Sequence, residues 1–340
     1  MQTQQMPLLS FLATPNVQFA IPIFQRVYSW TERECADFFD DAYRAGAADE
    51  AHFMGIVLHS IDPEGWRGFD QIDIIDGQQR LTTLSILMSV IADRLKETGS
   101  ELDGMDADAL RETYLVLQGK DSVEGKLALT YLDRYTLFAL ACSIEIPEEH
   151  AQRVIDNRDY FARRIAEDGF DLQTLWRGLK NLTIISTRLT GDDAPQLVFE
   201  SLNSKGMPLS VGDLVSNHLL MSGDAEEQMR LFTQYWKPIE DLVDSQDETQ
   251  FDISAIITAW LADKFRDIHI NGESEVYGIF KDHLRDGHAG SFESLLKDLL
   301  GYAQRYATDV AFRAAANHNA EDWVGGKPVK LVSELKLFGD

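Results

Sequence analysis

The segment IIDGQQRLTTLSILMSVIADRL, residues 74–95, constrains the fold more than any other part of the chain. Apolar residues that end a predicted strand lead into the polar box DGQQR at residues 76–80, and a long stretch with apolar residues at helical spacing follows at once. The segment therefore predicts a strand, a sharp turn and a helix in direct succession, with polar side chains at the start of the helix.

The residues at this predicted turn have the chemistry of an anion site. A helix N-terminus presents free backbone N–H groups and the positive end of the helix dipole, and both favour phosphate. Gly77 permits a sharp turn or the close approach of a ligand, and Arg80 can bind a phosphate through two N–H groups. Asp76 can bind a water, a metal ion or Arg80 itself.

Four neighbouring side chains add neutral hydrogen-bonding groups to the same turn: Gln78, Gln79, Thr82 and Thr83. A helix cap in which Asp76 pairs with Arg80 and nothing binds explains the same residues. The segment alone leaves both interpretations open.

A second glutamine–arginine pair, Gln25-Arg26, lies within IPIFQRVYSW at residues 21–30. Each of the two pairs comes just after an apolar extended segment. Tyr28 and Trp30 flank this copy and can stack on a base or a sugar. The alternative is that these aromatic side chains belong to the core and that Arg26 binds a carboxylate.

The third polar stretch is FESLNSKGMPLS at residues 199–210. Asn203 and the residues after it predict a helix C-terminus with Gly206 in the left-handed cap. Glu200 and Asn203 are three residues apart and share one helix face, and Lys205 adds a cation. An ordinary helix–turn–helix corner is the alternative interpretation.

The hydrophobic pattern predicts an α+β protein, with a mixed α/β front part and a largely helical remainder. The predicted strands are residues 17–21, 52–61, 69–75 and 182–189, with a hairpin loop at residues 62–68. The predicted helices are residues 32–46 behind a capping box of Thr31 and Glu34, and residues 81–95, 106–118, 148–167, 172–181, 211–221, 225–243, 253–265, 274–284 and 292–316. We place a boundary near Leu220, which gives a nucleotide-binding domain at residues 1–220 and a helical domain at residues 221–340.

Composition narrows the function classes. The net charge of −25 argues against a protein that coats nucleic acid with its whole surface, although a local basic groove stays compatible with it. No run approaches the ~18 apolar residues of a membrane span, and the N-terminus lacks the regions of a secretory signal, so we expect a cytoplasmic protein without a membrane partner. Cys35 and Cys142 cannot form a disulfide framework or a four-sulfur zinc site. The P-loop, GxGxxG and HExxH motifs are absent from the sequence.

Together the three polar stretches resemble the DGQQR-motif (DUF262) family, the N-terminal domain of GmrSD, SspE and BrxU-type restriction and phage-defence proteins. The residues that carry the resemblance are IPIFQRVYSW at 21–30, DGQQRLTTL at 76–84 and FESLNSKGMPLSVGDL at 199–214. Their order and approximate spacing agree with the family pattern, and the resemblance extends over roughly residues 8–285.

The resemblance implies a ParB/sulfiredoxin-like mixed α/β nucleus, and it implies binding and hydrolysis of a nucleotide coupled to DNA restriction. By matching position it implies these site residues: Gln25, Arg26, Asp76, Gly77, Gln78, Gln79, Arg80, Glu200 and Asn203. In this family a domain with an HNH-type nuclease motif often follows, in the same or a separate chain. This sequence stops before any such motif, and residues 331–340 predict a helix cut short. We therefore expect the N-terminal part of a longer protein.

Our first functional hypothesis is an NTP-hydrolysing sensor domain that uses GTP or ATP with Mg²⁺ and responds to modified DNA. Arg26 and Arg80 would bind phosphates, Gln79 would belong to the catalytic set, and Asp76 or Glu200 would orient water or Mg²⁺. One alternative is an endonuclease or nickase that acts through the same box with a metal at Asp76. Another is a non-catalytic module that binds DNA or a protein. The first hypothesis requires Arg26, Arg80 and Asn203 to converge in one anion pocket.

Overall fold

A computed structural model gives the structure of residues 1–23, 25–66, 68–119, 122–190, 193, 198, 210–220, 225–244, 252–264, 273–285 and 291–321. Within these ranges no helix is long and apolar enough to cross a membrane. The chain divides into two compact units, Met1–Leu209 with Ser216–Ser222, and Ser210–Val215 with Gly223–Asp340. Each unit is described by itself.

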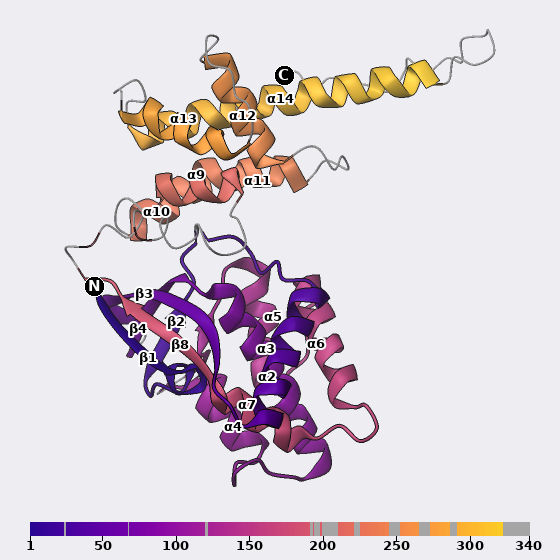
Figure 1. Cartoon of the computed structure of the whole chain (residues 1–340). Coiled ribbons are helices and arrows are strands. Elements are labelled where there is room, and N and C mark those ends of the chain that lie inside the picture. Colours follow the sequence, from indigo (N-terminus) through magenta and orange to yellow (C-terminus); the bar gives the residue numbers. More distant parts are fainter. Residues whose placement is uncertain are drawn as a thin grey trace. The chain divides into compact units, whose positions relative to one another are not determined.

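The first unit contains a six-stranded mixed sheet with the strand order β1-β8-β3-β4-β2-β7 (Figure 1). Its strands are β1 (Gln2–Pro7), β2 (Val17–Ala20), β3 (His52–Trp66), β4 (Phe69–Asp76), β7 (Leu127–Ala128) and β8 (Leu182–Arg188). Two short strands, β5 (Val116–Gln118) and β6 (Val123–Gly125), form a separate antiparallel pair.

Strand direction determines where the polar motifs meet. β2 runs parallel to both β4 and β7, whereas β3 is antiparallel to β4 and parallel to β8. β1 pairs with β8 in the antiparallel direction. The carboxyl ends of β4, β2 and β7 therefore lie at the same edge of the sheet, where open α/β sheets commonly bind ligands. The DGQQR box follows β4, and the segment IPIFQRVYSW follows β2.

Helices complete the first unit and share one hydrophobic core with the sheet. They are α1 (Leu8–Leu12), α2 (Glu32–Ala48), α3 (Gln78–Thr98), α4 (Ala107–Tyr114), α5 (Tyr131–Cys142), α6 (Gln152–Ile165) and α7 (Leu172–Asn181). α3 contacts α4, α5 and α6, which explains why Leu84, Leu87 and Met88 have no exposed surface. The helix that carries the DGQQR box is thus a central element of the core.

The α2–α7 contact depends on two glycines. A Cβ atom built on Gly178 would lie 1.7 Å from the carbonyl oxygen of Ala42, and one built on Gly46 would lie 1.9 Å from that of Thr174. The two helix backbones therefore approach more closely than any side chain permits. This close contact fixes α2, whose first turn follows directly after the segment IPIFQRVYSW.

The second unit is helical in its described part. α9 (Val211–Leu220) is divided between the units, with residues 211–215 in the second unit and residues 216–220 in the first. The other helices of the second unit are α10 (Ala225–Leu231), the π-helix η1 (Phe232–Trp236), α11 (Lys237–Asp244), α12 (Ile253–Lys264), α13 (Glu273–Arg285) and α14 (Phe292–Glu321). Trp236, Trp260 and Phe280 are buried here, and the Trp260 indole N–H donates to Asp298 at 2.8 Å. The tryptophans therefore anchor this unit's core.

The mixed sheet with a largely helical remainder confirms the predicted fold class at this level. The capping box is also confirmed, since the Thr31 N–H donates to Glu34 at 2.7 Å and α2 begins at Glu32. The predicted hairpin is confirmed, since β3 and β4 pair in the antiparallel direction, but its loop is shorter than residues 62–68 because β3 continues to Trp66, which pairs with Phe69.

Two predicted helices also need correction. The helix predicted at residues 106–118 ends at Tyr114, because residues 116–118 pair with β6 as strand β5. The helix predicted from residue 148 begins at Gln152. β1 and α5 are not among the predicted elements. The polar, mostly exposed residues of β1 give no hydrophobic alternation to detect.

We predict that Gly178→Ala destabilises the first unit by about 3 kcal/mol, the upper end of the usual cost of overpacking, because the new methyl group collides with the backbone of α2. Urea denaturation followed by circular dichroism measures this. Gly278→Ala in α13 is the matched control, since a Cβ there meets nothing within 4 Å, and we expect it to be neutral or stabilising. An unchanged Gly178→Ala midpoint would contradict the contact.

Candidate functional site

The turn between β4 and α3 is built on Gly77. This residue has φ of 104°, a conformation that favours glycine, and it is the N-cap of α3 without any side-chain cap. A Cβ atom at this position would also lie 3.0 Å from Cγ2 of Val57. The turn therefore requires glycine and leaves the first N–H groups of α3 without a capping side chain, as the anion-site interpretation expects.

Arg80 is bound to the neighbouring strand β3. Its Nη1 donates to the carbonyl oxygen of Met54 at 2.7 Å, and its Nη2 donates to that of Ile56 at 2.6 Å. Gly55 lies between them with φ of 104°, and a Cβ there would be 2.6 Å from Nη1. Asp76 is 3.6 Å from Nη2. Burial lowers the pKa of Arg80, and the nearby Asp76 opposes this effect. Two N–H groups of the Arg80 guanidinium thus join the first turn of α3 to strand β3.

The two glutamines of the box bind the backbone of the other motif. Gln78 Nε2 donates to the carbonyl oxygen of Arg26 at 2.7 Å. Gln79 Oε1 accepts from the N–H groups of Ser29 and Trp30 at 2.9 and 3.2 Å, and its Nε2 donates to the carbonyl oxygen of Val27 at 3.3 Å. The structure therefore brings the first two polar stretches together.

Gln25 makes the reciprocal contact. Its Nε2 donates to the carbonyl oxygen of Ile75 at 2.8 Å, at the end of β4. Residues 25 and 26 are thus joined to the strand and the helix that flank Gly77. We call residues 26–30 the QR loop. Hydrogen bonds thus join two sequence motifs that lie about fifty residues apart.

Beneath the QR loop, the Tyr28 hydroxyl is the centre of a buried polar network. It lies 2.7 Å from Thr83 Oγ1 and 3.3 Å from Cys35 Sγ, and it accepts from Asn157 Nδ2 at 3.1 Å. Burial raises the pKa of Tyr28 above its usual range and that of Cys35 to about 11, so both groups are neutral. Tyr28 is therefore a core residue, as the alternative interpretation of its motif proposed.

Thr82 and Thr83, two of the predicted nucleotide-binding residues, have no exposed surface. The Thr83 hydroxyl contacts Tyr28, and the Thr82 hydroxyl has no hydrogen-bond partner among the described residues. The structure places both hydroxyls in the core below the QR loop rather than on its surface.

Helices α5 and α6 supply two contacts to the QR loop that sequence reasoning missed. Asp133 Oδ2 accepts from the backbone N–H of Tyr28 at 2.6 Å, and Asn157 Nδ2 donates to the carbonyl oxygen of Trp30 at 2.7 Å. Both residues lie more than a hundred positions along the chain from the loop. No local sequence pattern marks them.

Four helices begin around the QR loop. α2 follows it directly, Gln78 and Gln79 belong to the first turn of α3, Asp133 belongs to the first turn of α5, and Asn157 lies in the second turn of α6. α3, α5 and α6 have no side-chain cap at their N-termini. Because each N-terminus carries a partial positive charge, their arrangement favours a bound anion.

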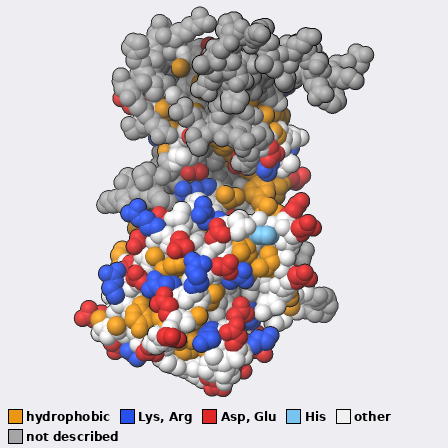
Figure 2. All heavy atoms as spheres, turned by 90° about the vertical axis from the view of Figure 1, so that its right-hand side faces the viewer, with side chains coloured by type: hydrophobic (Ala, Val, Ile, Leu, Met, Phe, Trp, Pro, Cys, Tyr) orange, Lys and Arg blue, Asp and Glu red, His pale blue; other side chains and the backbone are white. Residues whose placement is uncertain are grey.

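Arg26 supplies the positive charge of the QR loop. Its partly exposed side chain has no ion pair or hydrogen bond to any described residue. The side chains of Arg134 and Arg153, in the first turns of α5 and α6, likewise form no hydrogen bond or ion pair with any described residue. Seen from the side of α5 and α6, basic, acidic and hydrophobic side chains are interspersed over the surface of the first unit (Figure 2). Basic and acidic side chains are thus mixed on this face of a chain with a net charge of −25.

The remaining predicted site residues, Glu200, Asn203 and Lys205, lie outside the described residues. Their convergence with Arg26 and Arg80 stays a prediction. Among the residues that the structure describes, no group of three or more His, Cys, Asp or Glu side chains is placed to bind a metal ion. Asp76, the predicted metal ligand, has a partly exposed carboxylate next to Gly77.

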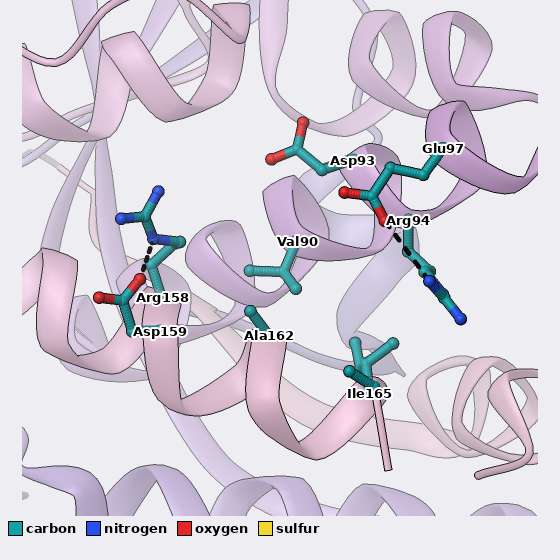
Figure 3. Close-up of a pocket in the computed structure, with 9 residues that line it drawn as sticks. Val90, Asp93, Arg94, Glu97, Arg158, Asp159, Ala162 and Ile165 are labelled. Carbon is teal, nitrogen blue, oxygen red and sulfur yellow. Dashed lines mark hydrogen bonds and ion pairs between the residues drawn. The ribbon is translucent and has the colours of Figure 1, made fainter. Parts of the chain in front are cut away.

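A groove of about 450 Å³ lies between α3 and α6 (Figure 3). Its lining residues are Val90, Asp93, Arg94, Glu97, Arg158, Asp159, Ala162, Ile165 and Ala166. Its two arginines are already paired, Arg94 with Glu97 at 3.4 Å and Arg158 with Asp159 at 2.6 Å. The groove therefore offers less for an anion than the QR loop does.

The family model for the GmrSD restriction endonuclease N-terminal domain matches residues 8–220, more than half of the chain. The protein belongs to this family, as its three motifs predicted. No curated protein matches the chain.

The two arginines of the motifs should respond differently to substitution. We predict that Arg80→Met destabilises the protein by about 3 kcal/mol, because it leaves the carbonyl groups of Met54 and Ile56 without their donors. Arg26→Met should change stability by less than ~0.5 kcal/mol, since this side chain has no described partner. Chemical denaturation of both variants measures the difference. Equal destabilisation would show that Arg80 has no special structural role.

The carboxyl group of Asp133 is buried, and burial raises its pKa from 3.8 to about 6, although the Tyr28 N–H lowers it. The folded state therefore binds this proton more tightly than the unfolded state, so ionisation of the carboxyl group costs stability that grows as the pH rises from about 4 to about 6 and is fully present above pH 6. We predict that Asp133→Asn, which keeps an acceptor oxygen, raises the free energy of unfolding by about 2–3 kcal/mol at pH 8. The difference should disappear as the pH falls through 6 to 4. A pH-independent difference would contradict this assignment.

Proposed function

We propose that this chain is an NTP-binding and NTP-hydrolysing regulatory domain of a restriction protein that acts on modified DNA. The observation that supports it best is the QR loop, whose backbone is bound by the DGQQR amides beside the uncapped N-terminus of α3, while Arg26 has no partner among the described residues. Phosphoryl transfer depends mainly on positioning and on neutralisation of charge. Free backbone N–H groups with an unpaired arginine offer both to a GTP or ATP phosphate.

In this proposal the motif residues have separate roles. Arg26 and the first N–H groups of α3 bind phosphate oxygens. Gln78 and Gln79 set the position of the QR loop. Arg80 fixes β3 against the box, and in this proposal its remaining N–H groups bind the ligand. From family resemblance, Glu200 and Asn203 complete the site, and Lys205 adds a cation from the same stretch.

Mg²⁺ is the metal that we propose for this site. Mg²⁺ in nucleotide sites is commonly bound by one or two carboxylates together with substrate phosphates and waters. The partly exposed carboxylate of Asp76, next to the turn at Gly77, fits the role of one such ligand. When bound, the ion would neutralise phosphate charge.

Two further proposals rest on the family resemblance. We propose that the sheet and its helices form a ParB/sulfiredoxin-like nucleus. We also propose that an HNH-type nuclease domain, in the same or a separate chain, cuts the modified DNA while this domain regulates it.

We predict that the purified protein releases phosphate from GTP or ATP in the presence of Mg²⁺. Arg26→Met should weaken nucleotide binding by at least about tenfold, the usual value of a charge-assisted hydrogen bond, without lowering the melting temperature. Calorimetric titration and a phosphate-release assay measure the two effects. Arg44→Met, which removes an exposed arginine of α2, is the matched control and should leave both unchanged.

Other outcomes would support the alternative functions. Nicking of modified plasmid DNA without nucleotide would indicate a nuclease that acts through the box. DNA binding with neither activity would indicate a binding module. Absence of heat with either triphosphate would overturn the proposed function.

A further inference from the structure

The backbone of the QR loop is bound almost entirely by side chains from other elements. From α3, Gln78 donates to the carbonyl group of residue 26. Gln79, also from α3, donates to the carbonyl group of residue 27 and accepts from the N–H groups of residues 29 and 30. α5 provides Asp133 for the N–H of residue 28, and α6 provides Asn157 for the carbonyl group of residue 30. No backbone–backbone hydrogen bond is made by these loop residues within the described part of the chain.

The contacts from α5 and α6 are made by polar groups that are costly to bury. Asp133 is 5% exposed, and no cation among the described residues forms an ion pair with it. Asn157 has no exposed surface, and its Oδ1 atom has no hydrogen-bond partner in the described structure. A buried carboxylate without a cation, or an amide oxygen without a donor, reduces stability. Both side chains nevertheless point to the backbone of one loop.

We infer that Asp133 and Asn157 are positioning residues for the nucleotide site, where they fix the QR loop so that Arg26 faces the ligand. This inference rests on the proposed function. Gln78 and Gln79 bind the backbone of the loop from α3, and Asp133 and Asn157 bind it from α5 and α6. Without them the loop is bound on one side only, and Arg26 samples orientations that a bound phosphate must then restrict.

The packing around the loop makes the two contacts difficult to replace. Val27 is 50% exposed, and within the described part of the chain only Gln78, Gln79, Asp133 and Asn157 bind the backbone of residues 26–30. Asn157 also donates to the Tyr28 hydroxyl at 3.1 Å, so that it contacts both the backbone and the buried side chain of the loop. Asp133 and Asn157 thus act on adjacent parts of the same segment.

The test compares Asp133→Ala, Asn157→Ala and Asp133→Asn with the unmodified chain. The alanine variants should accelerate amide hydrogen exchange in residues 26–30 and weaken binding of GTP or ATP with Mg²⁺ by about tenfold. Asp133→Asn keeps an oxygen for the Tyr28 N–H. It should restore both the protection of the loop and the affinity to near the unmodified values.

Asp171→Ala is the matched control. Asp171 accepts from the backbone N–H of Gln173 at 3.0 Å at the start of α7, away from the QR loop. This variant should lose stability, as a lost N-cap does, while loop exchange and affinity stay unchanged. If it weakens nucleotide binding as much as Asp133→Ala does, the effect is general destabilisation and the inference is wrong.

The outcomes separate this inference from the proposed function. If the unmodified chain binds nucleotide and the alanine variants bind it equally well, the positioning role is overturned and the proposed function stands. If the unmodified chain binds neither triphosphate, the proposed function is overturned. Hydrogen exchange then still decides whether Asp133 and Asn157 fix the QR loop.

Discussion

The hydrogen bonds between Gln79 and the backbone of residues 27, 29 and 30 are the contacts on which the site depends. A primary amide is suited to this role because it donates and accepts at the same time and keeps both abilities at any pH. A carboxylate would repel the carbonyl group of Val27, and an ammonium group would find no acceptor in the N–H groups of Ser29 and Trp30. The amides of the DGQQR box therefore fix the backbone conformation of the QR loop.

The two arginines illustrate how similar side chains take different roles in one site. Arg80 lies against β3, where its planar guanidinium matches two carbonyl groups on either side of Gly55. Arg26 belongs to a loop whose backbone is already bound, so its side chain remains available. One arginine of the two motifs is thus used by the fold, whereas the other has no partner among the described residues.

Sequence reasoning found the local features and missed the distant ones. The strand, turn and helix around Gly77 were predictable, because apolar spacing and a glycine determine them within a few residues. The pairing of the two motifs came from the family resemblance, and the hydrogen bonds that join them needed coordinates. Asp133 and Asn157 were not predictable, because a side chain that binds a backbone group more than a hundred residues away leaves no periodic signal. The structural role of Arg80 was missed because a bulge at Gly55 has no distinctive pattern.

The buried network beneath the QR loop has a practical consequence for Cys35. This thiol has no exposed surface, and its pKa of about 11 keeps it protonated, so it is unreactive while the loop is in place. Cys142 is only partly buried and serves as an internal reference. The chain thus has a natural reporter of loop opening: alkylation of Cys35 relative to Cys142 would record how often the loop lifts from the helices below it.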